Sequence, residues 1–443
     1  MRTKVQRPLR WLPLLLGAYF SLQPVLAQIP VPGQPSPGKT LILNATAHLG
    51  NGQVIRNAAI AFENGKITAV TDAGLVPPDT SGYTRIIRAE GKHVYPGFIA
   101  GNTRLGLVEI GQVRATHDYD EAGEFLPNVR ALVSYNTDSK ITPTVRSNGV
   151  LVAEVAPKGG TISGVSSVME LDAWNWEDAV VRADAAIHLF WPKMFQQTGW
   201  WAEPGETKPN KIAEKKIAAI TAFFTHAKAY AQVTDHAEQN LRYEAMREVF
   251  DGRKAVFVHA NEARDILRVI NFVRQFELPR VVLVGGYDAW RLADQLKDLK
   301  IAVMLRRVHA LPLRHDDDID LPFRLPALLH EAGLLFCLQN AGDMEAMNTR
   351  NLPFLAGTAV AHGLDPEVAV QAITLNAARI LGVDDRLGSL EVGKDATLFI
   401  STGDALDPRS NNVEHAFIQG RVVDLDNHQR QLYRKFQAKY RQN

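Results

Sequence analysis

The sequence predicts an α/β protein, a (β/α)8 TIM-like barrel with a β-sandwich domain that is built from both chain ends. Three observations predict this fold class. Eight short apolar runs alternate with segments of helical spacing, which is typical of a parallel barrel. Both ends of the chain carry short strand-like segments with turn signals. The length of 443 residues and the hydrophobic fraction of 46% suit a large fold with a buried core.

The apolar runs give the expected barrel strands. They lie near residues 97–102, 149–156, 166–171, 186–191, 255–259, 281–285, 301–305 and 334–339. Apolar residues repeat at helical spacing from Ala263 to Val273, after the fifth run. Asp365 and Pro366 have the residue types of a helix cap and a first helical position. Strands and helices therefore alternate over the barrel, which we expect to span residues 95–385.

The sandwich is predicted from the two ends of the chain together. Asn51-Gly52 and Asn64-Gly65 are strong hairpin signals within the block 40–94. This block is too small to close its own core comfortably, so we expect it to pair with residues 386–426. A helix over 427–443 should follow. It spaces Leu432, Phe436 and Tyr440 four apart, and we expect it to pack against the barrel or a sister chain.

The N-terminus has the pattern of a secretion signal. Four basic residues within the first ten positions precede an apolar run over 11–22, and small residues at 25–27 form a cleavage pattern. The apolar run is shorter than the ~20 residues that span a bilayer, which favours a cleaved signal peptide over a membrane anchor. We therefore expect a signal peptide at 1–27, a flexible lead-in at 28–39, and a periplasmic or extracellular protein.

Charge and cysteine content exclude several classes of partner and bond. The chain has 49 basic and 48 acidic side chains and a net charge of +1, which predicts no nucleic-acid partner. No further uncharged run is long enough for a transmembrane domain in the mature chain. Cys337 is the single cysteine, so no disulfide can form within the chain.

Several motifs resemble the amidohydrolase superfamily, in particular an imidazolonepropionase-like, secreted subgroup. Residues 94–106 resemble its first barrel strand, 376–382 its last barrel helix, and 388–396 its return to the sandwich. A long insertion at 107–148 and the GGTISGVSS segment at 159–167 are similar to the secreted subgroup. The resemblance covers about residues 40 to 425. It implies hydrolysis of non-peptide carbon–nitrogen bonds at a zinc site on the C-terminal face of the barrel.

The family's metal ligands are replaced at most matching positions. Asn102 and Arg104 stand where the first strand carries its paired histidines, Gly285 replaces the histidine of the sixth strand, and Asn340 replaces the aspartate of the eighth. His259 on the fifth strand remains. Asparagine is a poor ligand for a transition metal, and arginine stays protonated. A catalytic zinc typically takes three protein ligands, so we expect no cofactor.

Four other positions or segments carry side chains that could replace the missing metal ligands. Asp343 follows Asn340 by three positions and could serve, beside His259, only if the eighth strand ends later than expected. His188 could point into the lumen, although a packed, hydrogen-bonded histidine is favoured. His309 and the acidic run 315–318 could form a new site, but a solvated loop is the favoured interpretation of that run.

The expected ligand-binding residues are therefore Asn102, Arg104, His259 and Asn340, and His259 is the best catalytic candidate. Arg104 could bind a carboxylate or phosphate, or it could neutralise an acidic residue where the metal would lie. Three hypotheses follow. The protein is a catalytically silent binding or partner subunit, an active hydrolase of amides or cyclic amides with a rearranged site, or a periplasmic binding module for an anionic solute. A small-molecule ligand, a homo-oligomer and pairing with an active paralogue are compatible with this sequence.

Overall fold

The computed structural model describes residues 31–200, 202–342 and 344–441, and the chain from residue 32 onward forms one compact unit. The predicted signal peptide at 1–27 lies outside the described residues, as do Asp343 and the first three residues of the lead-in at 28–39. The two sheets of this unit carry the architecture and position the candidate site.

The barrel is a sheet of eight strands within the described residues, with the order β15-β14-β13-β12-β9-β8-β7-β6. A parallel bridge between Gly101 and Gln339 brings the first and last strands together, so the sheet is nearly closed. The strands are β6 (Phe98–Thr103), β7 (Val150–Val155), β8 (Ile162–Glu170), β9 (Val180–Phe190), β12 (Ala255–Ala260), β13 (Val281–Gly285), β14 (Ala302–Leu305) and β15 (Phe336–Leu338). Each predicted apolar run forms one of these strands, which confirms the predicted barrel.

One strand runs in the direction opposite to that expected of a (β/α)8 barrel. β8 pairs antiparallel with both β7 and β9, whereas the other neighbours in this sheet pair in parallel. The connection over 156–161 is too short for a crossover, which needs a dozen or more residues. β7 and β8 therefore form a hairpin, and Gly159 and Gly160 in its turn both adopt positive φ.

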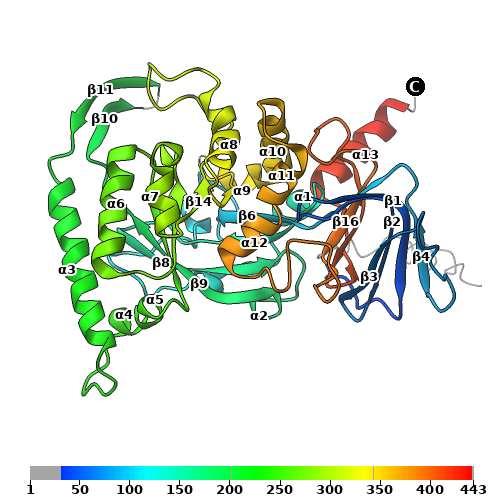
Figure 1. Ribbon diagram of the computed structural model, residues 1–443, viewed down its shortest axis with the longest axis horizontal. Coiled ribbons are helices and arrows are strands. Elements are labelled where there is room, and N and C mark those ends of the chain that lie inside the picture. Colours follow the sequence, from blue (N-terminus) through cyan, green and yellow to red (C-terminus); the bar gives the residue numbers. More distant parts are fainter. Residues whose placement is uncertain (1–30, 201, 343, 442–443) are drawn as a thin grey trace, which may run out of the picture. The chain divides into compact units, whose positions relative to one another are not determined.

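Helices cover the barrel strands on the outside (Figure 1). The longer ones are α3 (Ala213–Ala231), α6 (Ala263–Phe276), α7 (Ala293–Asp298), α8 (Leu321–Glu331), α10 (Leu352–Ala361), α11 (Pro366–Ala372) and α12 (Leu375–Leu381). Short helices are α1 (Thr142–Arg146), α2 (Trp176–Ala179), α4 (Leu241–Glu244), α5 (Arg247–Phe250) and α9 (Glu345–Asn348). Asp365 caps α11 as expected, because its side chain accepts hydrogen bonds from two backbone N–H groups of the first turn.

Both chain ends contribute strands to the second sheet, as the sequence predicts. Its path is β18-β17-β16-β5-β1-β2-β3, with β4 also paired to β1. The strands are β1 (Thr40–His48), β2 (Val54–Glu63), β3 (Lys66–Asp72), β4 (Arg85–Arg88), β5 (His93–Pro96), β16 (Leu398–Ser401), β17 (Val413–Ile418) and β18 (Arg421–Val422). The antiparallel pairing of β5 with β16 joins the two ends of the chain. The exact boundaries of the barrel at 95–385 and of the two sandwich segments at 40–94 and 386–426 stay a prediction.

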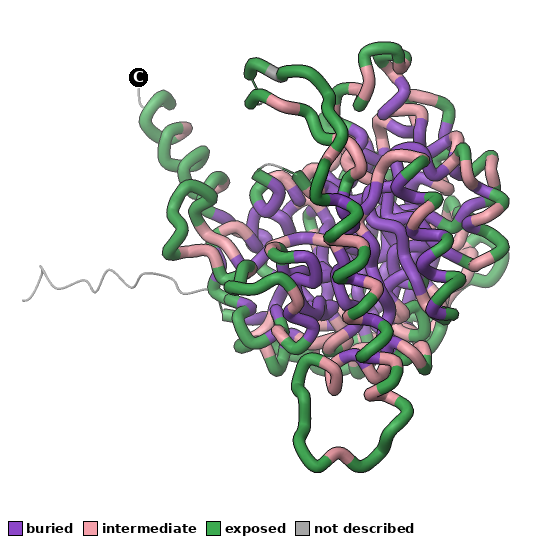
Figure 2. Tube along the Cα trace, turned by 90° about the vertical axis from the view of Figure 1, so that its left-hand side faces the viewer, coloured by how far each residue is buried: buried purple, intermediate pink, exposed green. Residues whose placement is uncertain are grey.

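The insertion at 107–148 lies against the barrel rather than apart from it. Phe125 and Arg130 form parallel bridges with Ile162 and Val165 of β8. A separate hairpin of β10 (Phe195–Trp200) and β11 (Glu203–Pro209) follows β9. It is mostly exposed and projects from the barrel (Figure 2).

The C-terminal helix α13 (His428–Arg441) does not pack against the barrel as expected. Leu432, Phe436 and Tyr440 are 37%, 46% and 69% exposed, and the helix extends away from the buried interior in Figure 2. Its first turn is held by a hydrogen bond of 2.8 Å from Thr144 Oγ1 to Gln429 Oε1. Arg434 of the second turn donates to Asp426 Oδ1 at 2.6 Å, so the contacts of the helix lie at its N-terminal half. The helix is strongly basic and offers a narrow apolar stripe. Packing against a sister chain stays a prediction.

No helix within the described ranges is both long enough and apolar enough to cross a bilayer.

Glu170, at the end of β8, joins the barrel to the second sheet. Its carboxylate binds Arg421 and accepts a hydrogen bond of 3.0 Å from Gln419 Nε2. Burial raises the pKa of Glu170 from 4.5 to about 7, and the nearby charge of Asp172 adds to this effect while Arg421 opposes it. The folded state therefore holds the Glu170 proton more tightly than the unfolded chain does.

We expect Glu170→Gln to remove a pH-dependent loss of stability. A raised pKa in the folded state stabilises it fully below pH 4.5, and this contribution is lost as the pH rises through about 7. The wild-type free energy of unfolding should fall by up to ~3 kcal/mol relative to the variant over this range. Urea unfolding at pH 4.5 and pH 8 measures the difference. Glu331→Gln, at an exposed residue of α8, should leave the wild-type pH dependence in place, and an unchanged profile in Glu170→Gln would contradict the prediction.

Candidate functional site

A pocket of about 440 Å³ opens at the C-terminal ends of the barrel strands. Its wall includes Asn102 at the end of β6, Phe190 at the end of β9, His259 at the end of β12 and Gly285 at the end of β13. The C-terminal face is where barrel enzymes place their active sites, because the loops that follow the strands converge there. This pocket is the candidate functional site.

Three titratable side chains form a hydrogen-bonded chain that leads from the lumen to this pocket. His188 Nδ1 lies 2.9 Å from His259 Nε2, and His188 Nε2 lies 3.0 Å from Glu154 Oε1. Glu154 on β7 and His188 on β9 are fully buried, whereas His259 is partly exposed at the pocket wall. His188 thus points into the lumen and is also packed and hydrogen-bonded. We refer to this row of three hydrogen-bonded residues as the Glu154–His188–His259 chain.

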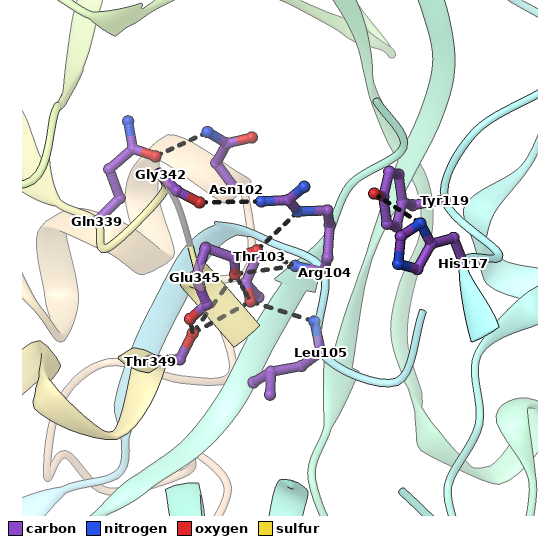
Figure 3. Close-up of polar contacts among 10 residues, drawn as sticks. All are labelled: Asn102, Thr103, Arg104, Leu105, His117, Tyr119, Gln339, Gly342, Glu345 and Thr349. Carbon is purple, nitrogen blue, oxygen red and sulfur yellow. Dashed lines mark hydrogen bonds and ion pairs between the residues drawn. The ribbon is translucent and has the colours of Figure 1, made fainter. Parts of the chain in front are cut away.

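Asn102 closes the other end of this network. Its backbone N–H donates to Glu154 Oε2 at 2.7 Å. Its side-chain Nδ2 donates to Gln339 Oε1 at 2.7 Å, as Figure 3 shows. Gln339 in turn donates from Nε2 to the carbonyl of Met304 at 3.1 Å. Asn102 has φ of 49°, in the left-handed region that asparagine tolerates better than most residues. Its amide therefore links β6 to Gln339 after β15, at the point where the first and last strands of the barrel meet.

The protonation of the chain follows from its surroundings. Burial raises the pKa of Glu154, but hydrogen bonds from His188, Ser166 and the Asn102 backbone outweigh it and leave that pKa below its ordinary value. Burial lowers the pKa of His259 well below 6.5, and the positive charges of His188 and Lys158 add to the effect. His259 is therefore a neutral imidazole near pH 7, and its low pKa makes it a weak base.

Arg104 is bound by an acidic residue of its own chain (Figure 3). Its Nε donates to Glu345 Oε2 at 2.9 Å, and its backbone N–H donates to the same carboxylate at 3.0 Å. The side chain of Glu345 is 1% exposed, and Thr103 also donates to it. The guanidinium further binds the carbonyl of Gly342 at 3.1 Å and lies 4.9 Å from the ring centre of Tyr119. Of the two roles that the sequence left open, this geometry corresponds to the pairing with an acidic residue.

The lumen side chains do not fit a zinc ion. His188 uses its two ring nitrogens on two different partners, so Glu154, His188 and His259 lie in a row and do not converge on one point. The Asn102 amide is bound to Gln339. Over the described ranges, no group of three or more His, Cys, Asp or Glu side chains is arranged to hold a metal ion. The donor set therefore differs from that of a catalytic zinc site, which needs three converging ligands.

The alternative ligands from the acidic loop have other partners. His309 Nε2 lies 2.7 Å from Thr358 Oγ1. Asp317 accepts a hydrogen bond of 2.9 Å from the Tyr287 hydroxyl and pairs with Arg314. These contacts fasten the loop after β14 to the barrel.

The structure separates the four residues that the sequence predicted as one binding group. Asn102 and His259 line the pocket, whereas Arg104 and Asn340 are not among its lining residues. Asn340 is 5% exposed, and its Nδ2 has no partner among the described residues. Sequence reasoning missed Glu154, although a charged residue inside the apolar run 149–156 was a usable signal. It also missed Gln339 and Arg306, which follow β15 and β14 at the pocket.

Comparison with known proteins gives concordant results. The sequence profile of the Amidohydrolase family matches residues 324–423. The imidazolonepropionase of Symbiobacterium thermophilum is 25% identical over 398 residues, which cover 78% of this chain and 84% of that protein. An amidohydrolase from Thermotoga maritima MSB8 is 25% identical, with a TM-score of 0.74 over 87% of this chain and 99% of that one.

A more distant structure shares the fold alone. An adenosine deaminase from Xanthomonas campestris, solved with bound zinc, is 15% identical. The match covers 92% of this chain and 99% of that one, with a TM-score of 0.52.

The backbone at Gly285, which the sequence resemblance aligns with a metal ligand of the family, has no room for a side chain. Gly285 has φ of 105°, and a Cβ atom there would lie 2.7 Å from Asn261 Oδ1 and 2.9 Å from the Ala260 carbonyl. We expect Gly285→Ala to lower the free energy of unfolding by more than Gly363→Ala does. Gly363 has a similar φ of 103° but open space around it, so it reports the backbone strain of ~1–3 kcal/mol alone. Urea unfolding measures both, and equal losses would show that the site accepts a side chain.

Arg104 is expected to act as a structural counter-ion. Arg104→Met should lower the free energy of unfolding by ~3 kcal/mol, because the buried Glu345 carboxylate would lose its cation. The double variant Arg104→Met/Glu345→Gln should recover part of that loss. Arg114→Met, at an exposed residue of the insertion 107–148, serves as the control. Thermal and urea unfolding test the series, and unchanged stability in Arg104→Met would contradict the structural role.

Proposed function

Because this chain belongs to the amidohydrolase superfamily, we propose that it binds a small polar molecule in the barrel pocket and does not catalyse metal-dependent hydrolysis. The observation that carries the proposal is the Glu154–His188–His259 chain. Its members satisfy one another by hydrogen bonds where a hydrolase of this kind would present its lumen side chains to a metal ion.

The loss of hydrolysis follows from the chemistry of the remaining groups. Hydrolysis of an amide near neutral pH needs an activated water and a polarised carbonyl, and a metal ion supplies both. Of the three hydrogen-bonded residues Glu154, His188 and His259, only His259 lines the pocket. Its lowered pKa makes it a poor base. Arg104 is bound to Glu345. The described residues of the pocket thus provide hydrogen bonds without an evident means of activating water.

The pocket has the size and polarity of a small-molecule site. Its volume of about 440 Å³ lies within the ~300–1,000 Å³ that is common for ligand pockets. Trp191 and Asn261 line it, and the indole Nε1 and amide Oδ1 are buried without a partner among the described residues. An unpaired buried polar group costs free energy, and a ligand that pairs with it recovers that cost. Both atoms are enclosed by the pocket wall, so a ligand would reach them only after a side-chain movement.

An active hydrolase with a rearranged site is the second candidate. The observation in its favour is that the buried Glu154 carboxylate is hydrogen-bonded to His188, which is hydrogen-bonded in turn to His259. In hydrolases with a catalytic triad, a carboxylate similarly orients a histidine that acts as the base. In this protein the order would give His259 the catalytic position, with His188 and Glu154 as positioning residues.

We further propose that the protein is exported. The basic N-terminus, the apolar run and the small residues before position 28 support a cleaved signal peptide. N-terminal sequencing of the protein from the periplasmic or extracellular fraction tests this proposal, and a chain that still begins at residue 1 would refute it. Pairing with a catalytically active paralogue stays a prediction of the sequence.

Metal content and turnover distinguish the two candidate functions. We expect protein incubated with Zn²⁺ and then desalted to hold much less than one ion per chain by elemental analysis. Amide and cyclic amide substrates should show no hydrolysis above background, and His259→Ala should change nothing. An active zinc amidohydrolase treated in parallel is the control. Stoichiometric zinc with chelator-sensitive hydrolysis would refute the binding function, whereas zinc-independent turnover that His259→Ala abolishes would establish the rearranged hydrolase.

A further inference from the structure

We propose that Arg306 is the anchor of this pocket and that the ligand is a small organic carboxylate. This inference rests on the proposed binding function and names the class of molecule that the pocket takes. It assigns the anchoring role to a residue other than Arg104, whose guanidinium is bound to Glu345.

The position of Arg306 is fixed by the barrel. It directly follows β14, and its backbone N–H donates to the Gly285 carbonyl at 2.8 Å. Its guanidinium carbon lies 5.5 Å from the ring centre of Tyr287. That ring is fully buried, and its hydroxyl is bound to Asp317 at 2.9 Å. Arg306 therefore lines the pocket from a rigid strand end and rests on a ring that is itself held in place.

Arg306 differs from neighbouring arginines in its charge partners. Arg104 pairs with Glu345, and Arg314 pairs with Asp288 and Asp317. Among the ion pairs of the described residues, none includes Arg306. Its side chain is half-buried, and burial lowers the pKa of the guanidinium. A cation that is partly removed from water without a counter-ion favours the binding of an anion.

The other charged groups at the pocket leave this preference in place. Lys193 adds a second cation at the exposed rim. Glu262 and Asp265 are acidic, but Asp265 is buried and accepts a hydrogen bond of 3.3 Å from the Met194 backbone. Burial also raises the pKa of Asp265, and His259 is neutral near pH 7. Neither acidic residue forms an ion pair with Arg306 in the described part of the chain, so a planar carboxylate can bind the guanidinium with both oxygens.

Two uncharged residues of the pocket wall do not narrow the ligand class further. Trp191 is 6% exposed, and its Nε1–H has no acceptor among the described residues. Asn261 Oδ1 has no donor in the same part of the chain. Both atoms are buried and not exposed to the pocket, so the ligand class follows from Arg306 alone.

Matched acids and amides test the anchor directly. The probes are N-acetylglycine, succinate and benzoate, each compared with its uncharged primary amide, and inorganic phosphate. Calorimetric titration and thermal shift are measured on the wild type, Arg306→Met, Arg306→Lys and Arg274→Met. Arg274 is an exposed arginine at the far end of α6 and is the matched control. We expect at least one carboxylate to bind at least tenfold more tightly than its amide.

The variants separate the anchor from the fold and from the binding function. Arg306→Met should weaken carboxylate binding at least tenfold, Arg306→Lys should retain part of it, and Arg274→Met should match the wild type. An unfolding curve of Arg306→Met like that of the wild type shows that a loss of binding is not a loss of fold. Amides that bind as tightly as acids, unaffected by Arg306→Met, would overturn the anchor while the binding function stands. Binding of phosphate alone, or of no carboxylate, would also overturn it.

Discussion

The hydrogen bond between the buried Glu154 carboxylate and the His188 imidazole is the constraint on which the site depends. Both side chains are removed from water, so each needs a partner, and each finds it in the other at 3.0 Å. His188 then presents its second nitrogen to His259. Burial lowers the pKa of His259 and so keeps its imidazole neutral near pH 7. The lumen of the barrel is thus filled by a self-satisfied polar network, and the pocket above it is shaped by hydrogen-bonding groups.

We propose that this protein has an amidohydrolase-like fold without the family's metal chemistry. The barrel and the sheet built from both chain ends are similar to those of an amidohydrolase of solved structure, and a fold by itself does not specify a reaction. At the first strand, Asn102 uses its amide to hold Gln339. At the sixth, the backbone of Gly285 has a conformation that disfavours any side chain. These positions now stabilise the barrel opening, and the remaining cations at the pocket suggest recognition of a charged small molecule.

Most of the fold could be predicted from the sequence, because buried strands leave a strong apolar signal. Less of the site could be predicted. The antiparallel direction of β8 depends on the length of one connection, which the apolar pattern does not encode. Glu154 lies inside the apolar run 149–156, and the apolar residues of that run predict a buried strand without indicating a role for its one charged residue. Arg104 was expected near a ligand, but its partner Glu345 is 241 residues away in the chain, and such contacts have no local signature. The exposed helix α13 has an apolar stripe that predicts packing without indicating the partner.

The most direct test of the central claim is anomalous diffraction at the zinc absorption edge from crystals soaked in Zn²⁺. The account predicts no anomalous peak in the barrel lumen, with His188 in hydrogen-bond contact with both Glu154 and His259. A strong peak coordinated by Glu154, His188 and His259 would show that these side chains rearrange to bind a metal ion, and it would contradict the account.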